Sequence, residues 1–207
     1  PDVLAVFDAT LEALVHTGHT LVDVRLPTSS HALAAYYVIM PAEASTNLAR
    51  LDGMRYGLLE RGDTLLDDYI NSRTEGFGEE TRRRILLGTF VLSSGYIDAY
   101  YRKADAARAV LRQEYMNAFG KADVIAFPTT PSPAFKFGEK SDPLSMYLGD
   151  IFTVTANLTG QPALSVSMGF VERDGKQLPI GIHFTAPHQA EEMLFAAGKE
   201  VEKMRGF

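Results

Sequence analysis

Two short segments joined by a charged turn constrain the fold of this chain more than any other feature. Residues 163–168 and 180–184 both have the pattern of β-strands. Between them, residues 172–176 read ERDGK, and the Asp-Gly pair is a hairpin signal. The sequence therefore predicts two strands connected by this turn, followed by a closing helix over about 190–204.

The amino-terminal part has the pattern of a helix followed by a strand. Apolar residues between Val3 and Val15 recur at helical spacing, and Gly18 ends the helix. Residues 19–26 then have the pattern of a strand, which Pro27 terminates. Because helices that pack on strands build layered domains, the predicted class is α/β, with layered helices around a mixed β-sheet.

Helical patterns fill the middle of the chain, and a buried strand is predicted over 123–128. The expected helices are 32–50 with an interruption near Pro41, 64–71, 79–92, 97–119 and 150–158. A turn, EGFG at 75–78, precedes the third of these helices, whose first residues Glu79 and Glu80 favour a helix N-terminus.

Composition excludes several functional classes. The 207 residues carry a formal charge of −6, so sequence-independent binding to nucleic acid by this chain alone is not expected. There is no cysteine, which excludes disulfide scaffolds, zinc–thiolate sites and cysteine nucleophiles. No apolar run approaches the roughly 18–20 residues of a membrane span.

The chain opens with Pro1-Asp2-Val3 and has no initiator Met, which indicates a piece of a longer protein. No basic leader segment is present, so the expected location is cytoplasmic. No repeat or low-complexity linker divides the sequence. We therefore expect residues 1–207 to be the carboxyl-terminal portion of a single domain.

Several motifs favour a structural role over a chemical one. Residues 93–95, Ser-Ser-Gly, lack the flanking glycines of a nucleophile turn and are interpreted as a junction between helices. Arg61-Gly62-Asp63 is interpreted as a turn, His16 and His19 as solvent-facing, and His183 as a packed or edge residue of a strand. No metal site is predicted. No motif in the sequence pairs a catalytic nucleophile with a general base.

The densest basic run is Arg82-Arg83-Arg84. Successive helical residues are rotated by about 100°, so the three side chains do not share one face. Arg84 precedes Ile85-Leu86-Leu87 and is expected to turn inward. A partly buried arginine needs an anion, which is either a carboxylate side chain or a ligand.

Three blocks of sequence resemble a known family. They are YYVIMPAEASTNLAR at 36–50; EGFG at 75–78 with RRILLGTF at 83–90 and GYIDAYYRKA at 95–104; and PTTP at 128–131 with DPLSMYLGD at 142–150. The blocks are similar to the A subunits of glutamine-dependent aspartyl/glutamyl-tRNA amidotransferases, within the amidase signature family. The resemblance spans nearly all of the chain and corresponds to the carboxyl-terminal part of those subunits.

The resemblance implies an activity for the whole subunit. Such a subunit hydrolyses glutamine through a serine acyl-enzyme and releases ammonia to B and C partner subunits. The partner holds misacylated Glu-tRNA(Gln) or Asp-tRNA(Asn) and uses ATP and Mg²⁺; no cofactor is expected in this chain. The family's Lys, cis-Ser and nucleophilic Ser belong to the amino-terminal part, so we expect no catalytic residue here and no activity from this chain alone.

The resemblance also implies a site for the head group of glutamine. Arg84 corresponds to the residue that binds the α-carboxylate, Asp150 to the residue that binds the α-amino group, and Tyr36 to a residue that lines the same pocket. A zwitterionic amino acid requires one cation and one anion close together. Charge-assisted hydrogen bonds of this kind contribute roughly 1.5–3 kcal/mol each.

Two other functions remain open from the sequence. One is an amidase-signature hydrolase of small carboxamides, which needs neither tRNA nor the charged pair Arg84 and Asp150. The other is a binding or scaffold module without catalysis. The segment at 185–189, TAPHQ, also departs from the Gly-Lys-Pro-Phe sequence usual in the family.

Overall fold

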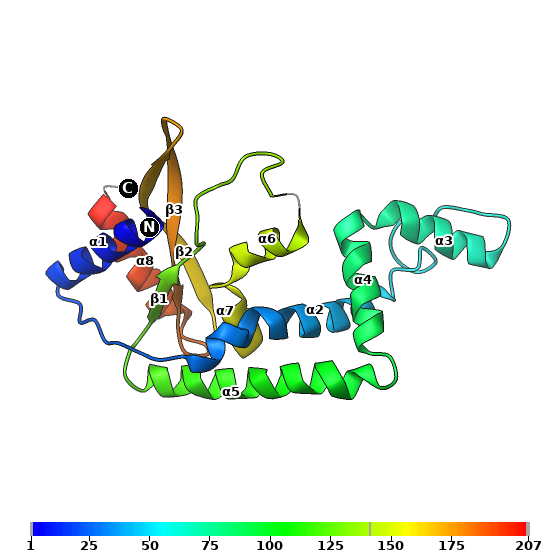
Figure 1. The fold of residues 1–207 in the computed structure, drawn as a ribbon, viewed down its shortest axis with the longest axis horizontal. Coiled ribbons are helices and arrows are strands. Elements are labelled where there is room, and N and C mark those ends of the chain that lie inside the picture. Colours follow the sequence, from blue (N-terminus) through cyan, green and yellow to red (C-terminus); the bar gives the residue numbers. More distant parts are fainter. Residues whose placement is uncertain (1, 141, 206–207) are drawn as a thin grey trace. The chain divides into compact units, whose positions relative to one another are not determined.

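A computed structural model describes residues 2–140 and 142–205. The chain divides into two compact units, one formed by the residues up to Leu33 with those from Ala107 onward, the other by Ala34–Ala106. Figure 1 shows the order of the elements along the chain. The α/β class with layered helices is confirmed, and the prediction of one domain over 1–207 stays a prediction.

The first unit is built on a three-stranded sheet with strand order β1-β3-β2. The strands are β1 (Ile125–Pro128), β2 (Ala163–Arg173) and β3 (Lys176–Thr185). Both pairings are antiparallel, so in the described residues the sheet is not mixed as predicted. For β2 and β3 the reason is the tight turn between them, which permits only antiparallel pairing.

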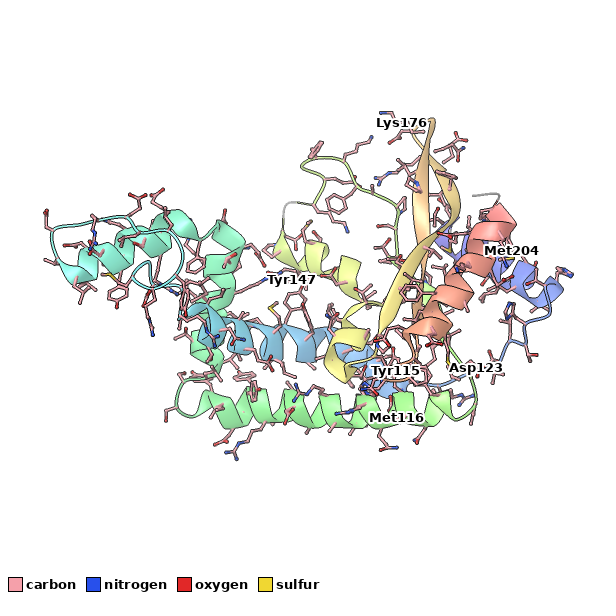
Figure 2. All side chains as sticks on the ribbon, turned by 180° about the vertical axis from the view of Figure 1, so that it is seen from behind. Tyr115, Met116, Asp123, Tyr147, Lys176 and Met204 are labelled. Atoms are coloured by element: carbon pink, nitrogen blue, oxygen red, sulfur yellow. The ribbon has the colours of Figure 1, made fainter. Side chains whose placement is uncertain are left out.

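The predicted hairpin is confirmed and extends further than expected. Asp174 and Gly175 have φ angles of 52° and 72°. Two successive residues in this left-handed region form the turn that matches the twist of paired strands. Figure 2 shows Lys176 at the far tip of this hairpin.

Helices α1 (Asp2–His16) and α8 (Glu191–Arg205) pack on one face of the sheet (Figure 1). Their apolar stripes enclose the main core with alternate residues of β2 and β3, because successive strand residues point to opposite faces. The most deeply buried members of this core are Met168, Ile182, Phe184, Ala186 and Val201. Gly18, just after α1, has a φ of 102°, as expected of a residue that ends a helix.

A second packed region of the first unit contains Tyr115 of α5 (Arg102–Phe119). This side chain is fully buried and donates a hydrogen bond to Thr155 Oγ1 at 2.8 Å. Figure 2 shows Tyr115 beside Met116, which is 46% exposed. The other short elements are η1 (Pro27–His31), α6 (Pro143–Tyr147), η3 (Leu148–Asp150) and α7 (Val154–Thr159). The helix predicted over 150–158 is thus a short 3₁₀ turn followed by a shorter helix.

The predicted strand at 19–26 is wrong. These residues have no regular secondary structure, and no strand among the described residues pairs with them. Leu21 and Val22 are 51% and 46% exposed. A strand pattern gives a strand only where a neighbouring backbone supplies the ladder of hydrogen bonds.

The second unit contains most of α2 (Ala32–Leu48), then α3 (Leu65–Gly76), α4 (Glu79–Val91) and the π-helical turn η2 (Ile97–Tyr101). The predicted interruption near Pro41 is wrong, because α2 continues through it. An interior proline costs about 3 kcal/mol. Here Ile39 and Ala42, on either side of Pro41, are buried, and tertiary packing outweighs the cost.

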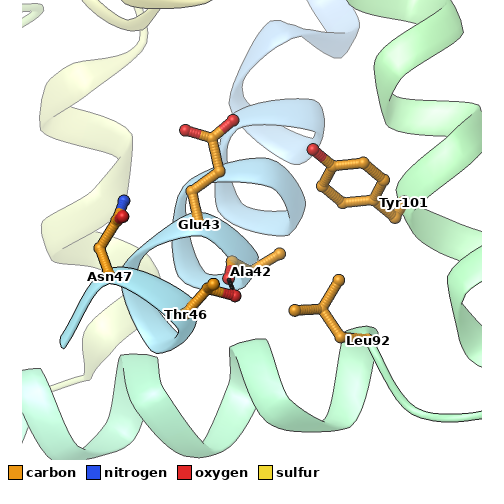
Figure 3. Close-up of a pocket in the computed structure, with 6 residues that line it drawn as sticks. All are labelled: Ala42, Glu43, Thr46, Asn47, Leu92 and Tyr101. Carbon is orange, nitrogen blue, oxygen red and sulfur yellow. Dashed lines mark hydrogen bonds between the residues drawn. The ribbon is translucent and has the colours of Figure 1, made fainter. Parts of the chain in front are cut away.

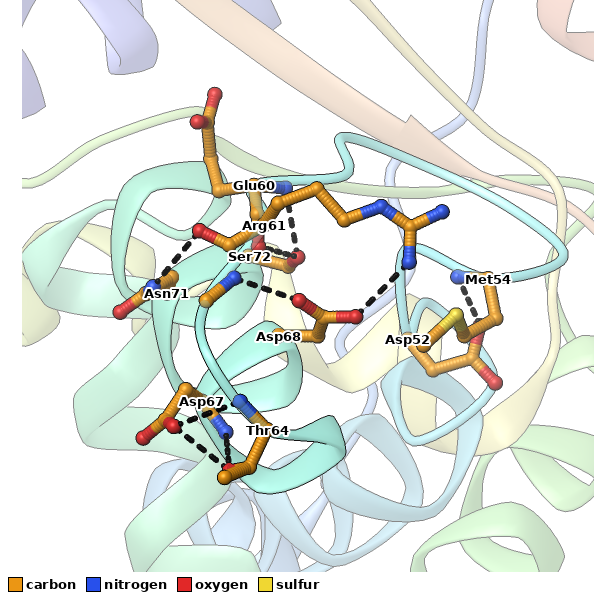
Figure 4. A network of polar contacts seen from close by, with 10 residues as sticks. Asp52, Met54, Glu60, Arg61, Thr64, Asp67, Asp68, Asn71 and Ser72 are labelled. Atoms are coloured by element: carbon orange, nitrogen blue, oxygen red, sulfur yellow. Dashed lines mark hydrogen bonds and ion pairs between the residues drawn. The ribbon is translucent and has the colours of Figure 1, made fainter.

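A polar network holds the loop between α2 and α3 (Figure 4). The buried carboxylate of Asp68 accepts a hydrogen bond from the backbone N–H of Gly62 at 2.6 Å and pairs with Arg61 at 2.9 Å. The Gly62 hydrogen bond, together with Arg61, lowers the pKa of Asp68 against the opposing effect of burial. Arg61-Gly62-Asp63 is therefore part of a structured loop, in line with its interpretation as a turn.

Candidate functional site

The candidate site begins in the first turns of α4. Gly78 precedes the helix, and Glu79 and Glu80 lie in its first turn, where the helix dipole stabilises negative charge. Glu80 Oε1 accepts a hydrogen bond from Arg84 Nε at 2.8 Å. Arg83 pairs with both Glu79 and Glu80. The carboxylate that a partly buried Arg84 requires is thus supplied, within the described residues, by Glu80.

Arg84 turns toward α2, as the sequence predicted. Its side chain is 33% exposed, and its Nη1 lies 3.8 Å from the sulfur of Met40. Burial disfavours the charged guanidinium, but Glu80 and the neighbouring Tyr37 and Tyr36 outweigh this and raise the pKa of Arg84. Arg84 therefore carries a permanent positive charge at the surface of α2.

Tyr36 belongs to the same neighbourhood. Its ring packs edge to face against Tyr37, with ring centroids 5.2 Å apart. Both rings come from the first half of α2, one turn before Met40. The structure thus brings two of the three predicted site residues, Tyr36 and Arg84, into one unit.

Asp150 lies in the other unit, at the end of η3. It is exposed, and its backbone carbonyl accepts hydrogen bonds from the backbone N–H and the hydroxyl of Thr153. Two residues further on, Phe152 stacks on Phe127 of β1 with centroids 6.2 Å apart. This stacking anchors the segment that carries Asp150 to the sheet.

A cavity of about 250 Å³ lies further along α2 (Figure 3). Its lining residues are Ala42, Glu43, Thr46, Asn47, Leu92 and Tyr101. Figure 3 shows the Tyr101 hydroxyl directed toward the side of the cavity where Glu43 stands. The lining offers carboxylate, amide and hydroxyl oxygens, which suit a ligand that donates hydrogen bonds.

Met40 follows Tyr36 by four residues, Glu43 follows Met40 by three, and Asn47 follows Glu43 by four. Side chains at this spacing lie on one face of a helix. One stripe of α2 therefore runs from the neighbourhood of Arg84 to the cavity. The resemblance gave no role to Glu43 or Asn47, although their helical spacing from Tyr36 could have indicated a shared face.

Sequence reasoning also missed two contributors to the site, Glu80 and Gly88. Glu80 could have been found, because a glutamate four residues before an arginine on a helix is a typical ion pair. Gly88 packs against the backbone of α2, a contact between helices that no local pattern reveals.

The other motifs have the structural roles expected of them. Residues 93–95 form the junction after α4, where Gly95 has a φ of 84°. His16 and His19 are exposed, and His183 is packed in the central strand β3 with 6% exposure.

Comparison with known proteins places these elements in a family. A sequence profile described as Amidase matches residues 1–195. The chain belongs to the amidase family. Matched relatives include the A subunits of glutamyl-tRNA(Gln) amidotransferases from Rhodospirillum rubrum, with 48% identity over 100% of this chain, and from Deinococcus radiodurans, with 50% identity over 98% of it.

Solved structures agree with this amidase assignment. The A subunit of a glutamyl-tRNA(Gln) amidotransferase from Thermotoga maritima superposes with a TM-score of 0.70 and 37% identity, over 97% of this chain and 38% of that one. An allophanate hydrolase from Kluyveromyces lactis has a TM-score of 0.71 at 18% identity and shares the fold, over 98% of this chain and 29% of that one.

This amidase chain spans about two fifths of the length of its relatives, 41% for the Rhodospirillum rubrum protein and 42% for the Deinococcus radiodurans protein. Among its described residues, no helix is both long and apolar enough to cross a membrane.

Proposed function

We propose that this chain is the carboxyl-terminal part of a glutaminase subunit of a tRNA-dependent amidotransferase, and that it supplies contacts to the head group of glutamine. The observation that carries the proposal is Arg84, a one-third-exposed guanidinium fixed through Nε and flanked by Tyr36. The identity of about half with proteins named amidotransferase A subunits supports it.

In this proposal the α-carboxylate of glutamine binds Arg84 and the α-amino group binds Asp150. Because Glu80 already engages Nε, the carboxylate would meet the guanidinium through its terminal Nη groups. Tyr36 would form a wall of the same pocket. A neutral amide would form neither of these charge-assisted bonds, so the pocket would favour glutamine over simple carboxamides.

The hydrolytic step would use a serine nucleophile, a cis-serine and a lysine supplied by the amino-terminal part of the whole subunit. On this view the present chain is inactive by itself. The ammonia would pass to B and C partner subunits in the cytoplasm. There the partner would use ATP and Mg²⁺ to activate Glu-tRNA(Gln) or Asp-tRNA(Asn).

The test is ammonia release from glutamine by the full-length protein that contains this sequence, assembled with its partner subunits. We expect Arg84→Ala and Asp150→Ala each to reduce kcat/KM by about tenfold or more, since each loses a charge-assisted bond. Arg82→Ala is the matched control, because Arg82 belongs to the same basic run but is exposed.

The alternative is an amidase that acts on small carboxamides without tRNA. Absence of glutaminase activity in the wild-type complex would reject the proposed function. Unchanged glutamine hydrolysis in both Arg84→Ala and Asp150→Ala would favour the alternative.

A further inference from the structure

Helix α4 packs directly against the backbone of α2 at Gly88. A Cβ atom placed on Gly88 would lie 1.9 Å from the carbonyl oxygen of Pro41 and 2.7 Å from Ser45 Oγ. Real Cβ atoms essentially never come within 3.0 Å of such neighbours. Since the nearest obstacle is backbone, rotation of a side chain does not relieve it. Only glycine therefore permits this separation of the two helices.

Arg84 lies one helical turn before Gly88 and on the same face of α4. Its Nη1 contacts Met40, the residue that directly precedes Pro41 in α2. The two contacts, Arg84 with Met40 and Gly88 with Pro41, are therefore neighbouring points of a single helix–helix interface. The depth at which Gly88 packs fixes how close the guanidinium comes to Tyr36 and Tyr37.

We propose that Gly88 is a positioning residue for recognition of the substrate α-carboxylate, acting through Arg84. The inference rests on the proposed function, because it gives Arg84 a substrate to hold. It adds a residue that never touches glutamine and yet sets the affinity for its head group.

The expected consequence of a larger side chain follows from the geometry. An added Cβ must move from 1.9 Å to at least 3.0 Å from the Pro41 carbonyl oxygen, so α4 shifts by about 1 Å relative to α2. A misplacement of this size costs up to about 100-fold where a group must be oriented. The head group is remote from the bond that breaks, so the loss should appear in KM rather than in kcat.

The experiment compares Gly88→Ala with Leu86→Ala in the full-length protein and its complex. Leu86 lies on the same helix and is 71% exposed, so its truncation controls for changes in α4. We expect Gly88→Ala to raise KM for glutamine about 10- to 100-fold with kcat nearly unchanged. With glutaminamide, in which the α-carboxylate is replaced by a neutral amide, the variant and the wild type should have equal kcat/KM.

A double-mutant cycle separates positioning from general damage. In an Arg84→Ala background, Gly88→Ala should have little further effect on KM, because both substitutions remove the same interaction. The proposal would be overturned if Gly88→Ala raised KM for glutamine equally in the wild-type and Arg84→Ala backgrounds. It would also be overturned if Gly88→Ala lowered kcat/KM for glutaminamide as much as for glutamine. An unchanged KM for glutamine in Gly88→Ala would overturn it too.

Ser45→Thr tests the same idea should Gly88→Ala not fold. Ser45 Oγ would lie 2.7 Å from a Cβ on Gly88, so the larger side chain of Ser45→Thr should separate the helices less than Gly88→Ala does and raise KM less. An unchanged KM in Ser45→Thr would then overturn the proposal. A wild-type complex without glutaminase activity rejects the proposed function itself. A wild-type activity that depends on Arg84 but not on Gly88 or Ser45 rejects only this inference.

Discussion

Glu80 holds Arg84 by the Nε atom at 2.8 Å, and its second carboxylate oxygen binds Arg83. The arrangement is a counter-ion bridge between neighbouring arginines on one helical turn. It fixes the orientation of the Arg84 guanidinium before any substrate is present. It also sets a negative charge near the place where a substrate carboxylate would bind.

Replacement of Glu80 tests which of these two effects is larger. We expect Glu80→Ala to raise KM for glutamine about two- to tenfold, the worth of one lost hydrogen bond. The KM of Glu80→Gln should lie between those of the wild type and Glu80→Ala, since an amide oxygen still accepts a hydrogen bond from Arg84 Nε. Steady-state ammonia release by the intact complex measures both. A lower KM in Glu80→Ala would show that Glu80 competes with the substrate instead of positioning Arg84.

Tyr115 and Thr155 provide a test of the core of the first unit. The Tyr115 hydroxyl is buried and donates to Thr155 Oγ1, and burial raises the pKa of Tyr115 to about 12. We expect Tyr115→Phe to lower the free energy of unfolding by about 1 kcal/mol through loss of this bond. Urea denaturation measures the change. The cost of Tyr115→Phe should shrink in a Thr155→Val background, and full additivity would contradict the coupling.

The start of α3 depends on a capping box. Thr64 accepts a hydrogen bond from the backbone N–H of Asp67, and the Asp67 carboxylate accepts one from the backbone N–H of Thr64. We expect Thr64→Ala to destabilise the protein by about 1 kcal/mol. Thr89→Ala, at an exposed position inside α4, is the matched control and should not destabilise the protein, because alanine has the higher helix propensity. Equal effects of the two substitutions on thermal unfolding would contradict the role of the cap.

His183 makes the stability of the first unit depend on pH. Burial lowers the pKa of His183 below its ordinary 6.5, and its Nε2 has no hydrogen-bond partner among the described residues. The folded state therefore binds a proton less readily than the unfolded state. The contribution of His183 to stability is complete above pH 6.5 and is lost as the pH falls through its folded-state pKa.

We expect His183→Gln to flatten the fall in unfolding free energy between pH 6.5 and more acidic conditions. Urea denaturation at several pH values measures this slope. His16→Gln, at an exposed position, is the control and should leave the slope as it is. An unchanged slope in His183→Gln would assign the acid sensitivity to other groups.

The sequence predicted best those features that arise from local chemistry. Asp174-Gly175 specifies its turn by backbone conformation alone, and the hairpin follows. The inward turn of Arg84 was also predicted, but from an apolar neighbourhood that includes Leu86, which is in fact 71% exposed. The Arg84 orientation comes instead from contacts with α2 and Glu80.

Features that depend on distant partners could not be predicted from local patterns. Residues 19–26 have a strand pattern without a neighbouring strand in the described residues. Pro41 ends helices by its local chemistry, yet the packing around it keeps α2 continuous. Gly88 gains its role only because Pro41 lies opposite it, forty-seven positions earlier in the sequence.

The strand order β1-β3-β2 has a consequence for synthesis on the ribosome. The central strand is β3, the last of the three in the sequence, and both β1 and β2 pair only with it among the described strands. As the chain emerges, β1 and β2 therefore stay without a ladder until residues 176–185 have left the exit tunnel. Until then their backbones are open to pairing with other chains. A chain whose synthesis ends before Lys176 would thus contain two strands without their partner.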